Sequence, residues 1–250
     1  MIPENEIIQA LIELHRGMER QGPGDTAFTR HILSLLPKLP EKPRIADLGC
    51  GAGAGSLILA EWYQTDITAV DFSGPFLEDL KLRAKAKKLD HLIHALEADM
   101  GNLDWPEASV DILWSEGAAY NLTFRGALET WRPLMVKNGL AIVSEICWFT
   151  NDRPAPVMEY WQTAYPHIAG EKENAARASS AGYEVFGIHR LPSDAWWTNY
   201  YNPLNVRVKK VGHSADSAMR EVIAETEIEI DMFRRYSDFY GYSFYMLKAV

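Results

Sequence analysis

Asp47 is followed by a turn rich in glycine, with Gly49, Gly51 and Gly53 at alternate positions. Glycines at this spacing let the backbone approach a ligand closely, because any side chain there would block the approach. If a helix begins near residue 55, its first N–H groups and the positive end of its dipole face the same ligand. The turn therefore predicts a site for a ligand that carries a carboxylate or a phosphate.

The turn by itself admits two classes of ligand. Residues 49–54 also satisfy the relaxed dinucleotide-binding pattern, with alanine in the last position. Asp47, two residues before the first glycine, would attract a cationic amino group and repel a pyrophosphate. The aspartate thus favours a ligand with an amino group over a dinucleotide.

Two more acidic residues follow predicted strands. Asp71 ends the run 67–71, 22 residues after Gly49, where a carboxylate can accept both hydroxyls of a ribose. Asp99 and Met100 follow the run 94–98, where the carboxylate can accept from an adenine amino group and the thioether can cover the ring. Asp71 suits either cofactor class, and Asp99 could equally be a loop cap.

In order and spacing these pieces resemble the class I S-adenosylmethionine-dependent methyltransferases over residues 43–147. The resemblance implies S-adenosylmethionine as cofactor and S-adenosylhomocysteine as product. It places Asp47 and the three glycines, Gly49, Gly51 and Gly53, around the methionine moiety. It places Asp71 at the ribose, and Phe72, Asp99 and Met100 at the adenine. We add Glu116 to these predicted cofactor-binding residues.

The stretch 20–24, ahead of the glycine turn, is similar to an N-terminal motif of some small-molecule methyltransferases in this class. This likeness implies that Arg20 pairs with the carboxylate of the cofactor while the glycines let the loop close over it. The alternative is a plain connector between two helices.

Substrate contacts are expected where the chain leaves the later strands. A cluster of aromatic residues there could enclose an apolar or aromatic substrate, or bind a cationic amine through the ring faces. The same rings could instead be the packing core of a lid. No pair of histidines or acids has a spacing diagnostic of a general base, so no catalytic residue is assigned. The candidates are Tyr120, Trp148, Trp196, Trp197 and Tyr200.

The elements that must position these residues alternate between short β-rich runs and helices, which is typical of a mostly parallel sheet covered on both faces. We predict an α/β fold with a Rossmann-like sheet, and the resemblance implies seven strands with the last one antiparallel. The predicted strands are residues 44–47, 67–71, 94–98, 110–114, 139–145, 183–189 and 242–248.

The predicted helices divide a single domain, 1–250, into three parts. Residues 1–42 form a helical cap with helices 4–15 and 26–36, and residues 43–150 form the cofactor-binding core. Residues 151–250 supply substrate-side helices, an aromatic lid and the last two strands. We expect helices at 155–181 and 214–235, and a helix that stops at Asn138-Gly139 before the fifth strand. The basic stretch 81–88 is interpreted as the solvated face of a helix.

Composition narrows the class of protein. The net charge of -9 disfavours a nucleic-acid partner, and no apolar run is long enough to span a membrane. The first twenty residues do not resemble a secretory leader. Cys50 and Cys147 cannot build a disulfide framework or a metal site, so a cytoplasmic protein without metal is expected. The oligomeric state is not predicted.

The expected function is transfer of a methyl group from S-adenosylmethionine to oxygen, nitrogen or carbon of a small molecule. One rival is an NAD(P)-dependent oxidoreductase, which the relaxed glycine pattern allows and Asp47 disfavours. The other is a binding protein that responds to S-adenosylmethionine without turnover, because these motifs indicate binding and not catalysis.

Overall fold

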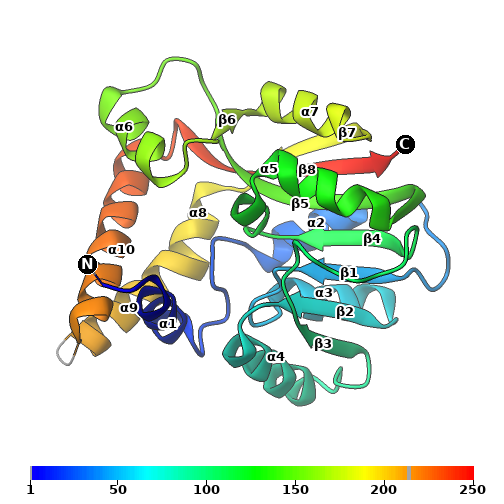
Figure 1. Cartoon of the computed structure of the whole chain (residues 1–250), viewed down its shortest axis with the longest axis horizontal. Helices are drawn as coiled ribbons and strands as arrows, with labels where there is room; N and C mark the ends of the chain where they lie inside the picture. Colours follow the sequence, from blue (N-terminus) through cyan, green and yellow to red (C-terminus); the bar gives the residue numbers. More distant parts are fainter. Residues whose placement is uncertain (1, 213–214) are drawn as a thin grey trace.

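A computed structural model describes residues 2–212 and 215–250, and within these eight strands form one sheet (Figure 1). Seven lie side by side in the order β3-β2-β1-β4-β5-β8-β7, and the two-residue β6 pairs with β5. The strand bounds are β1 Ile45–Leu48, β2 Ile67–Asp71, β3 Ile93–Glu97, β4 Val110–Ser115, β5 Met135–Trp148, β6 Ala169–Gly170, β7 Tyr183–Arg190 and β8 Tyr240–Ala249.

The predicted mostly parallel sheet with an antiparallel last strand is confirmed. Strands β1 to β5 pair in parallel, whereas β8 runs antiparallel to both β5 and β7. The order reverses next to β1, since β2 lies on one side of it and β4 on the other. In open α/β sheets the crevice at such a reversal, at the carboxyl ends of the strands, is where ligands bind.

Helices cover both faces of the sheet. One face buries a large cluster that includes Leu57, Leu80 and Phe233, and the other buries a smaller cluster around Phe124 and Trp131. The helix bounds are α1 Glu4–His15, α2 Thr26–Ser34, α3 Ala54–Tyr63, α4 Gly74–Ala86, α5 Phe124–Trp131, α6 Ala155–Ala164, α7 Glu171–Ser180, α8 Ser193–Trp196, α9 Asn202–Val211 and α10 Ser217–Tyr236. Short helical turns are η1 Ala119–Leu122, η2 Arg132–Leu134 and the π-helical η3 Trp197–Tyr201.

The cap and the late helices meet at one end of the sheet (left in Figure 1). α1 packs against both α9 and α10, which come near the other end of the chain. Trp148 at the end of β5 pairs with Tyr240 at the start of β8, so this is the end where the parallel strands finish. The helices therefore lie at the end of the sheet where a ligand is expected.

The interpretation of the lysines in the basic stretch as a solvated face is confirmed, whereas Arg83 of the same stretch is half-buried. α4 buries Phe76, Leu77, Leu80 and Ala84, while its lysines are exposed. Ser73 caps the helix, because its hydroxyl accepts from the Phe76 N–H. No helix among the described residues is long and apolar enough to cross a membrane.

Two predicted helix boundaries are wrong. The helix before β5 ends at Trp131, and Asn138 instead lies inside β5 with φ +63°, in the region where the pairing of β4 with β5 shifts register. An Asn-Gly pair suits a bulge as well as a helix end, because both need a left-handed backbone. The predicted helix 155–181 is interrupted because Pro166 disfavours helical backbone at the residue before it. Helix α10 begins at Ser217, and Ser214 lies outside the described residues.

Candidate cofactor and acceptor site

The glycine turn joins β1 to α3 and has a backbone that other residues rarely adopt. Gly49, Gly51 and Gly53 have φ of +72°, +53° and +79°. A Cβ on Gly49 would lie 2.2 Å from the Cβ of Ala118, and one on Gly53 would lie 2.0 Å from Leu80 Cδ1. The three glycines are therefore required both by conformation and by the close packing around the turn.

Asp71, at the end of β2, supports the turn directly. Its two carboxylate oxygens accept from the backbone N–H of Gly51 at 2.8 Å and of Ser73 at 2.9 Å. Burial raises the pKa of Asp71, and the backbone N–H donors oppose that rise. Each oxygen keeps a second lone pair for a ligand hydroxyl, so the carboxylate can serve the turn and a ribose together.

Asp47 is almost completely buried and faces no cation within the described chain. Its Oδ2 accepts from Ser56 Oγ at 2.5 Å. Burial raises its pKa to about 7, against the hydrogen bond from Ser56, and the nearby charges of Glu116 and Asp71 add to the rise. A carboxylate in this position is stabilised by an incoming cation.

Arg20 forms a buried ion pair with Glu116, which leaves β4. The distance from Arg20 Nη1 to Glu116 Oε2 is 2.9 Å, and the side chains are 6% and 11% exposed. Glu116 Oε1 accepts from both Thr29 Oγ1 and Trp114 Nε1 at 2.9 Å. Glu116 is thus occupied as a support for Arg20. The second terminal nitrogen of Arg20, Nη2, is buried with no partner within the described part of the chain, so it can donate to an anion.

The segment around Arg20 lies over the glycine turn. Gln21 Oε1 accepts from the Ala52 N–H at 2.7 Å, and Arg83 of α4 donates to the Ala52 carbonyl at 2.7 Å. A Cβ on Gly24 would lie 2.2 Å from Arg20 Nη1, so this glycine makes room for the guanidinium. The sequence did not single out Gln21 or Arg83, because only the folded chain places them against the turn.

The three residues predicted to meet an adenine lie on the open side of the turn. Phe72 is 61% exposed directly after Asp71. Met100 is half-buried, and its Sδ lies 3.4 Å from the position of a Cβ on Gly49. Asp99 is exposed, and its Oδ1 accepts from the Gly101 N–H at 2.7 Å, as a loop cap does. An exposed ring beside a strand-end carboxylate is suited to stacking on a base.

Two of the predicted substrate residues, Tyr120 and Tyr200, lie on the short helical turns η1 and η3. Tyr120 of η1 is 44% exposed. Tyr200 of η3 is buried, and its hydroxyl is 3.0 Å from His15 Nε2, whose ring Nδ1 lies 2.8 Å from the Leu11 carbonyl. Asn199 of the same π-helix donates to the Gly24 carbonyl and to Asp25. The aromatic lid, residues 196–201, is therefore hydrogen-bonded to the N-terminal cap next to the Arg20 segment.

The three predicted tryptophans take part in packing. Trp196 stacks on Phe233 with ring centroids 4.2 Å apart, and the Arg153 guanidinium lies 4.7 Å from the Trp148 ring. Trp197 is half-buried, with the Arg234 guanidinium 5.5 Å from its ring. Their contact with a substrate stays a prediction.

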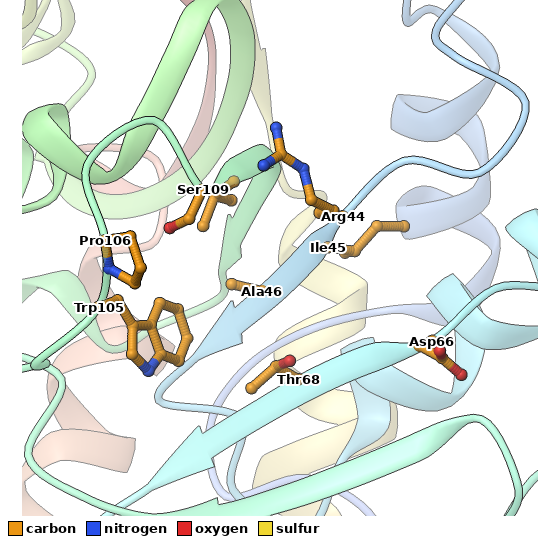
Figure 2. A pocket seen from close by; sticks show the side chains of 9 residues that line it. Arg44, Ile45, Ala46, Asp66, Thr68, Trp105, Pro106 and Ser109 are labelled. Carbon is orange, nitrogen blue, oxygen red and sulfur yellow. The ribbon is translucent and has the colours of Figure 1, made fainter.

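A separate cavity of about 330 Å³ lies away from these residues (Figure 2). It is lined by Arg44, Ile45, Ala46, Asp66, Thr68, Trp105, Pro106, Ser109 and Val110. Figure 2 shows Trp105 and Pro106 of the β3–β4 connection facing Ala46 and Thr68 on β1 and β2. None of the predicted site residues lines this cavity.

The family model described as "Methyltransferase domain" matches residues 45–139. Over 91 residues, the chain is 36% identical to the carboxy-S-adenosyl-L-methionine synthase of Photobacterium profundum, a match that spans 33% of this chain and 37% of the synthase. Over 158 residues it is 24% identical to the 2-methyl-6-phytyl-1,4-hydroquinone methyltransferase of Synechocystis, which spans 63% of this chain and 44% of that enzyme.

Among solved structures, the fold matches a SAM-dependent methyltransferase from Geobacter sulfurreducens in complex with S-adenosyl-L-homocysteine. The TM-score is 0.81 at 18% identity, covering 100% of this chain and 99% of that one. The domain match and this fold confirm the resemblance drawn from the glycine turn and its neighbours. The two curated relatives are named for different reactions, so a match to this domain does not identify the molecule that accepts the methyl group.

Proposed function

We propose that this chain, which is built around a class I methyltransferase domain, transfers a methyl group from S-adenosylmethionine to a small molecule. The observation that carries the proposal is the arrangement of charge around the turn. Asp47, Asp71 and Glu116 bring three carboxyl groups together, and Arg20 supplies one guanidinium. Such a site favours a ligand with more positive than negative charge and disfavours a pyrophosphate.

S-adenosylmethionine has the complementary charges: an ammonium, a sulfonium and one carboxylate. Arg20 Nη2, buried without a partner in the described chain, suits the carboxylate, and Asp47 suits the ammonium. Asp71 would bind the ribose, with Phe72, Met100 and Asp99 at the adenine. Glu116 acts through Arg20 as a positioning residue.

The cofactor supplies an activated methyl group, which passes to the acceptor as the bond to sulfur breaks and a bond to oxygen, nitrogen or carbon forms. The protein's part in such a displacement is alignment of the acceptor and exclusion of water. The cap and the lid, held together by Asn199 and the His15–Tyr200 contact, suit that task. We also infer a cytoplasmic protein, since Cys50 and Cys147 are free and buried.

Thermal stability separates this function from the NAD(P)-dependent oxidoreductase. We expect S-adenosylhomocysteine at 100 times its Kd to stabilise the protein by about 2.7 kcal/mol. For a chain of this size that corresponds to a rise in Tm of roughly 5–10 °C. NAD at the same concentration should leave Tm unchanged. A rise in Tm with NAD and not with S-adenosylhomocysteine would reverse the assignment. Incubation with labelled S-adenosylmethionine and a panel of phenols, amines and carboxylates then tests whether the protein transfers the methyl group or only binds the cofactor.

The pH dependence of binding tests the role of Asp47. Because its pKa is about 7, we expect the affinity for S-adenosylhomocysteine to fall as pH drops from 8 to 6, by about tenfold per unit below the pKa. Asp47→Asn should bind about 10- to 100-fold more weakly at pH 8 and lose this dependence between pH 6 and 8. Isothermal titration at several pH values measures both.

The pH dependence of folding stability in the free protein serves as the control, because it has the opposite sign to the pH dependence of affinity. A carboxyl group whose pKa is raised by folding stabilises the fold below its unfolded pKa, and this contribution is lost as pH rises through about 7. Asp47→Asn should therefore be more stable than the parent at pH 8, by the order of 1–4 kcal/mol, and similar to it only at about pH 3, below the unfolded pKa. A variant that is less stable at pH 8 and retains its affinity would remove Asp47 from the site.

A further inference from the structure

A half-buried carboxylate, Glu229 of α10, faces the aromatic residues of the lid. The hydroxyl of Tyr201, which is fully buried, donates to Glu229 Oε1 at 2.8 Å. No arginine, lysine or histidine among residues 2–212 and 215–250 forms an ion pair with Glu229. A carboxylate removed from water without a cation is unfavourable, and burial accordingly raises its pKa.

Tyrosines from four separate elements lie within the range of this carboxylate's charge. For each of them burial raises the pKa of the phenol, and the next largest cause is the negative charge of Glu229. The helical elements are α6, η1 and η3, and the strand is β8. The tyrosines are Tyr120, Tyr160, Tyr200, Tyr201 and Tyr240.

The ring of Tyr201 belongs to a cluster of aromatic side chains. Its centroid lies 5.2 Å from that of Tyr200 and 5.9 Å from that of Trp196. Trp196 in turn stacks on Tyr242 with ring centroids 5.0 Å apart, and a Cβ on Gly117 would be 3.4 Å from the Tyr242 hydroxyl. The cluster therefore reaches from the carboxylate to the segment after β4, where methyl transfer is predicted.

Buried polar groups in this cluster have no hydrogen-bond partner within the described chain. Tyr240 Oη is one, and its ring lies 5.8 Å from that of Phe233, which follows Glu229 by one helical turn. The indole N–H groups of Trp161 and Trp196 are also without partners, and both rings pack in the same aromatic cluster. A ligand with polar atoms would satisfy such groups, which are unfavourable when left unpaired.

We propose that the substrate is an organic amine whose ammonium group binds to Glu229 beside this aromatic cluster, while a separate atom of the same molecule, one with a free electron pair, accepts the methyl group. A carboxylate of this kind selects a cation, and electron-rich ring faces add to the attraction. The hydroxyl of Tyr240 can accept from the ammonium, while the two indole N–H groups suit an oxygen of the same molecule or water. The inference rests on the proposed function, and it specifies in addition that the substrate carries a positive charge.

The test compares amines with alcohols of the same shape on protein saturated with S-adenosylhomocysteine. The pairs are phenethylamine and 2-phenylethanol, hexylamine and hexanol, and cyclohexylamine and cyclohexanol. Isothermal titration should show at least one amine binding ten or more times as tightly as its alcohol. Glu229→Gln retains an oxygen that can accept from Tyr201, and it should abolish this preference without changing the rise in Tm caused by S-adenosylhomocysteine.

Glu227→Gln is the matched control, because Glu227 is exposed on the same helix and should keep the preference. If Glu229→Gln does not fold, the amine and alcohol comparison on the parent protein decides alone. Equal binding of every pair, or binding of neither member, on protein that S-adenosylhomocysteine stabilises overturns the amine proposal. Absence of any stabilisation by S-adenosylhomocysteine instead contradicts the proposed function, so the two failures are distinguishable.

Discussion

Replacing Gly49 by alanine is expected to abolish measurable binding of S-adenosylhomocysteine and to lower the free energy of unfolding by about 2–5 kcal/mol. The backbone of Gly49 has φ +72°, which alanine adopts only with strain. In addition, the new Cβ would lie 2.2 Å from the Cβ of Ala118, so one of two backbone segments must move. Both segments line the cofactor site. Titration calorimetry and chemical denaturation measure the two losses.

Gly17 provides the control for backbone strain alone. It has φ +75°, and nothing lies within 4 Å of the position of its Cβ. Gly17→Ala should therefore lower stability by only about 1–2 kcal/mol and leave affinity within twofold of the parent. Adding Ala118→Gly to Gly49→Ala removes the collision, and it should recover part of both affinity and stability. Full affinity in Gly49→Ala alone would show that the turn does not contact the cofactor.

Replacing Arg20 by methionine is expected to weaken binding of S-adenosylhomocysteine at least 100-fold and to destabilise the fold by about 3–5 kcal/mol. The substitution removes the buried Nη2 that suits the ligand's carboxylate. It also leaves the Glu116 carboxylate, 11% exposed, with the hydrogen bonds from Thr29 and Trp114 but without its cation. Arg20→Lys keeps the charge and loses the second donor, so we expect a smaller loss of stability than of affinity.

A double variant separates the two roles of Arg20. Adding Glu116→Gln to Arg20→Met removes the stranded charge, so stability should largely return while affinity stays low. The control pair is Arg16 with Glu78, which are 2.8 Å apart but 46% and 66% exposed. Arg16→Met should change stability by less than about 1 kcal/mol, because water screens an exposed pair. Recovery of affinity in the double variant would mean that Arg20 acts only through Glu116.

Much of the cofactor site could be predicted because its members are local to single strand-to-loop junctions. Asp47 and the three glycines lie on one turn, and Asp71 ends the strand that pairs with β1. A parallel pair of strands brings their carboxyl ends to one edge, so spacing along the chain is enough to place these residues near one another. The mostly parallel sheet with an antiparallel last strand could be predicted from the alternation of strands and helices together with the resemblance, whereas the order of the strands comes from the structure.

Boundaries that depend on pairing could not be predicted in the same way. Asn138-Gly139 is compatible with a helix end and with a bulge, and the pairing of β4 with β5 decides between them. Similarly, Trp148 and Trp196 could have contacted a substrate or packed in the lid. Their rings lie where they do because Phe233 and Tyr240, from later elements, fill the space beside them.

The amino-acid sequence by itself determined the class of cofactor, since the glycine spacing and the strand-end acids act through backbone geometry within a few residues of each other. Only the tertiary structure decided what the remaining charged residues do. Arg20 meets Glu116 across 96 residues, and Glu229 accepts a hydrogen bond from Tyr201, 28 residues earlier in the chain. The physical reason is that a charge's role depends on its burial and its partners, which are set by packing between elements distant in the chain.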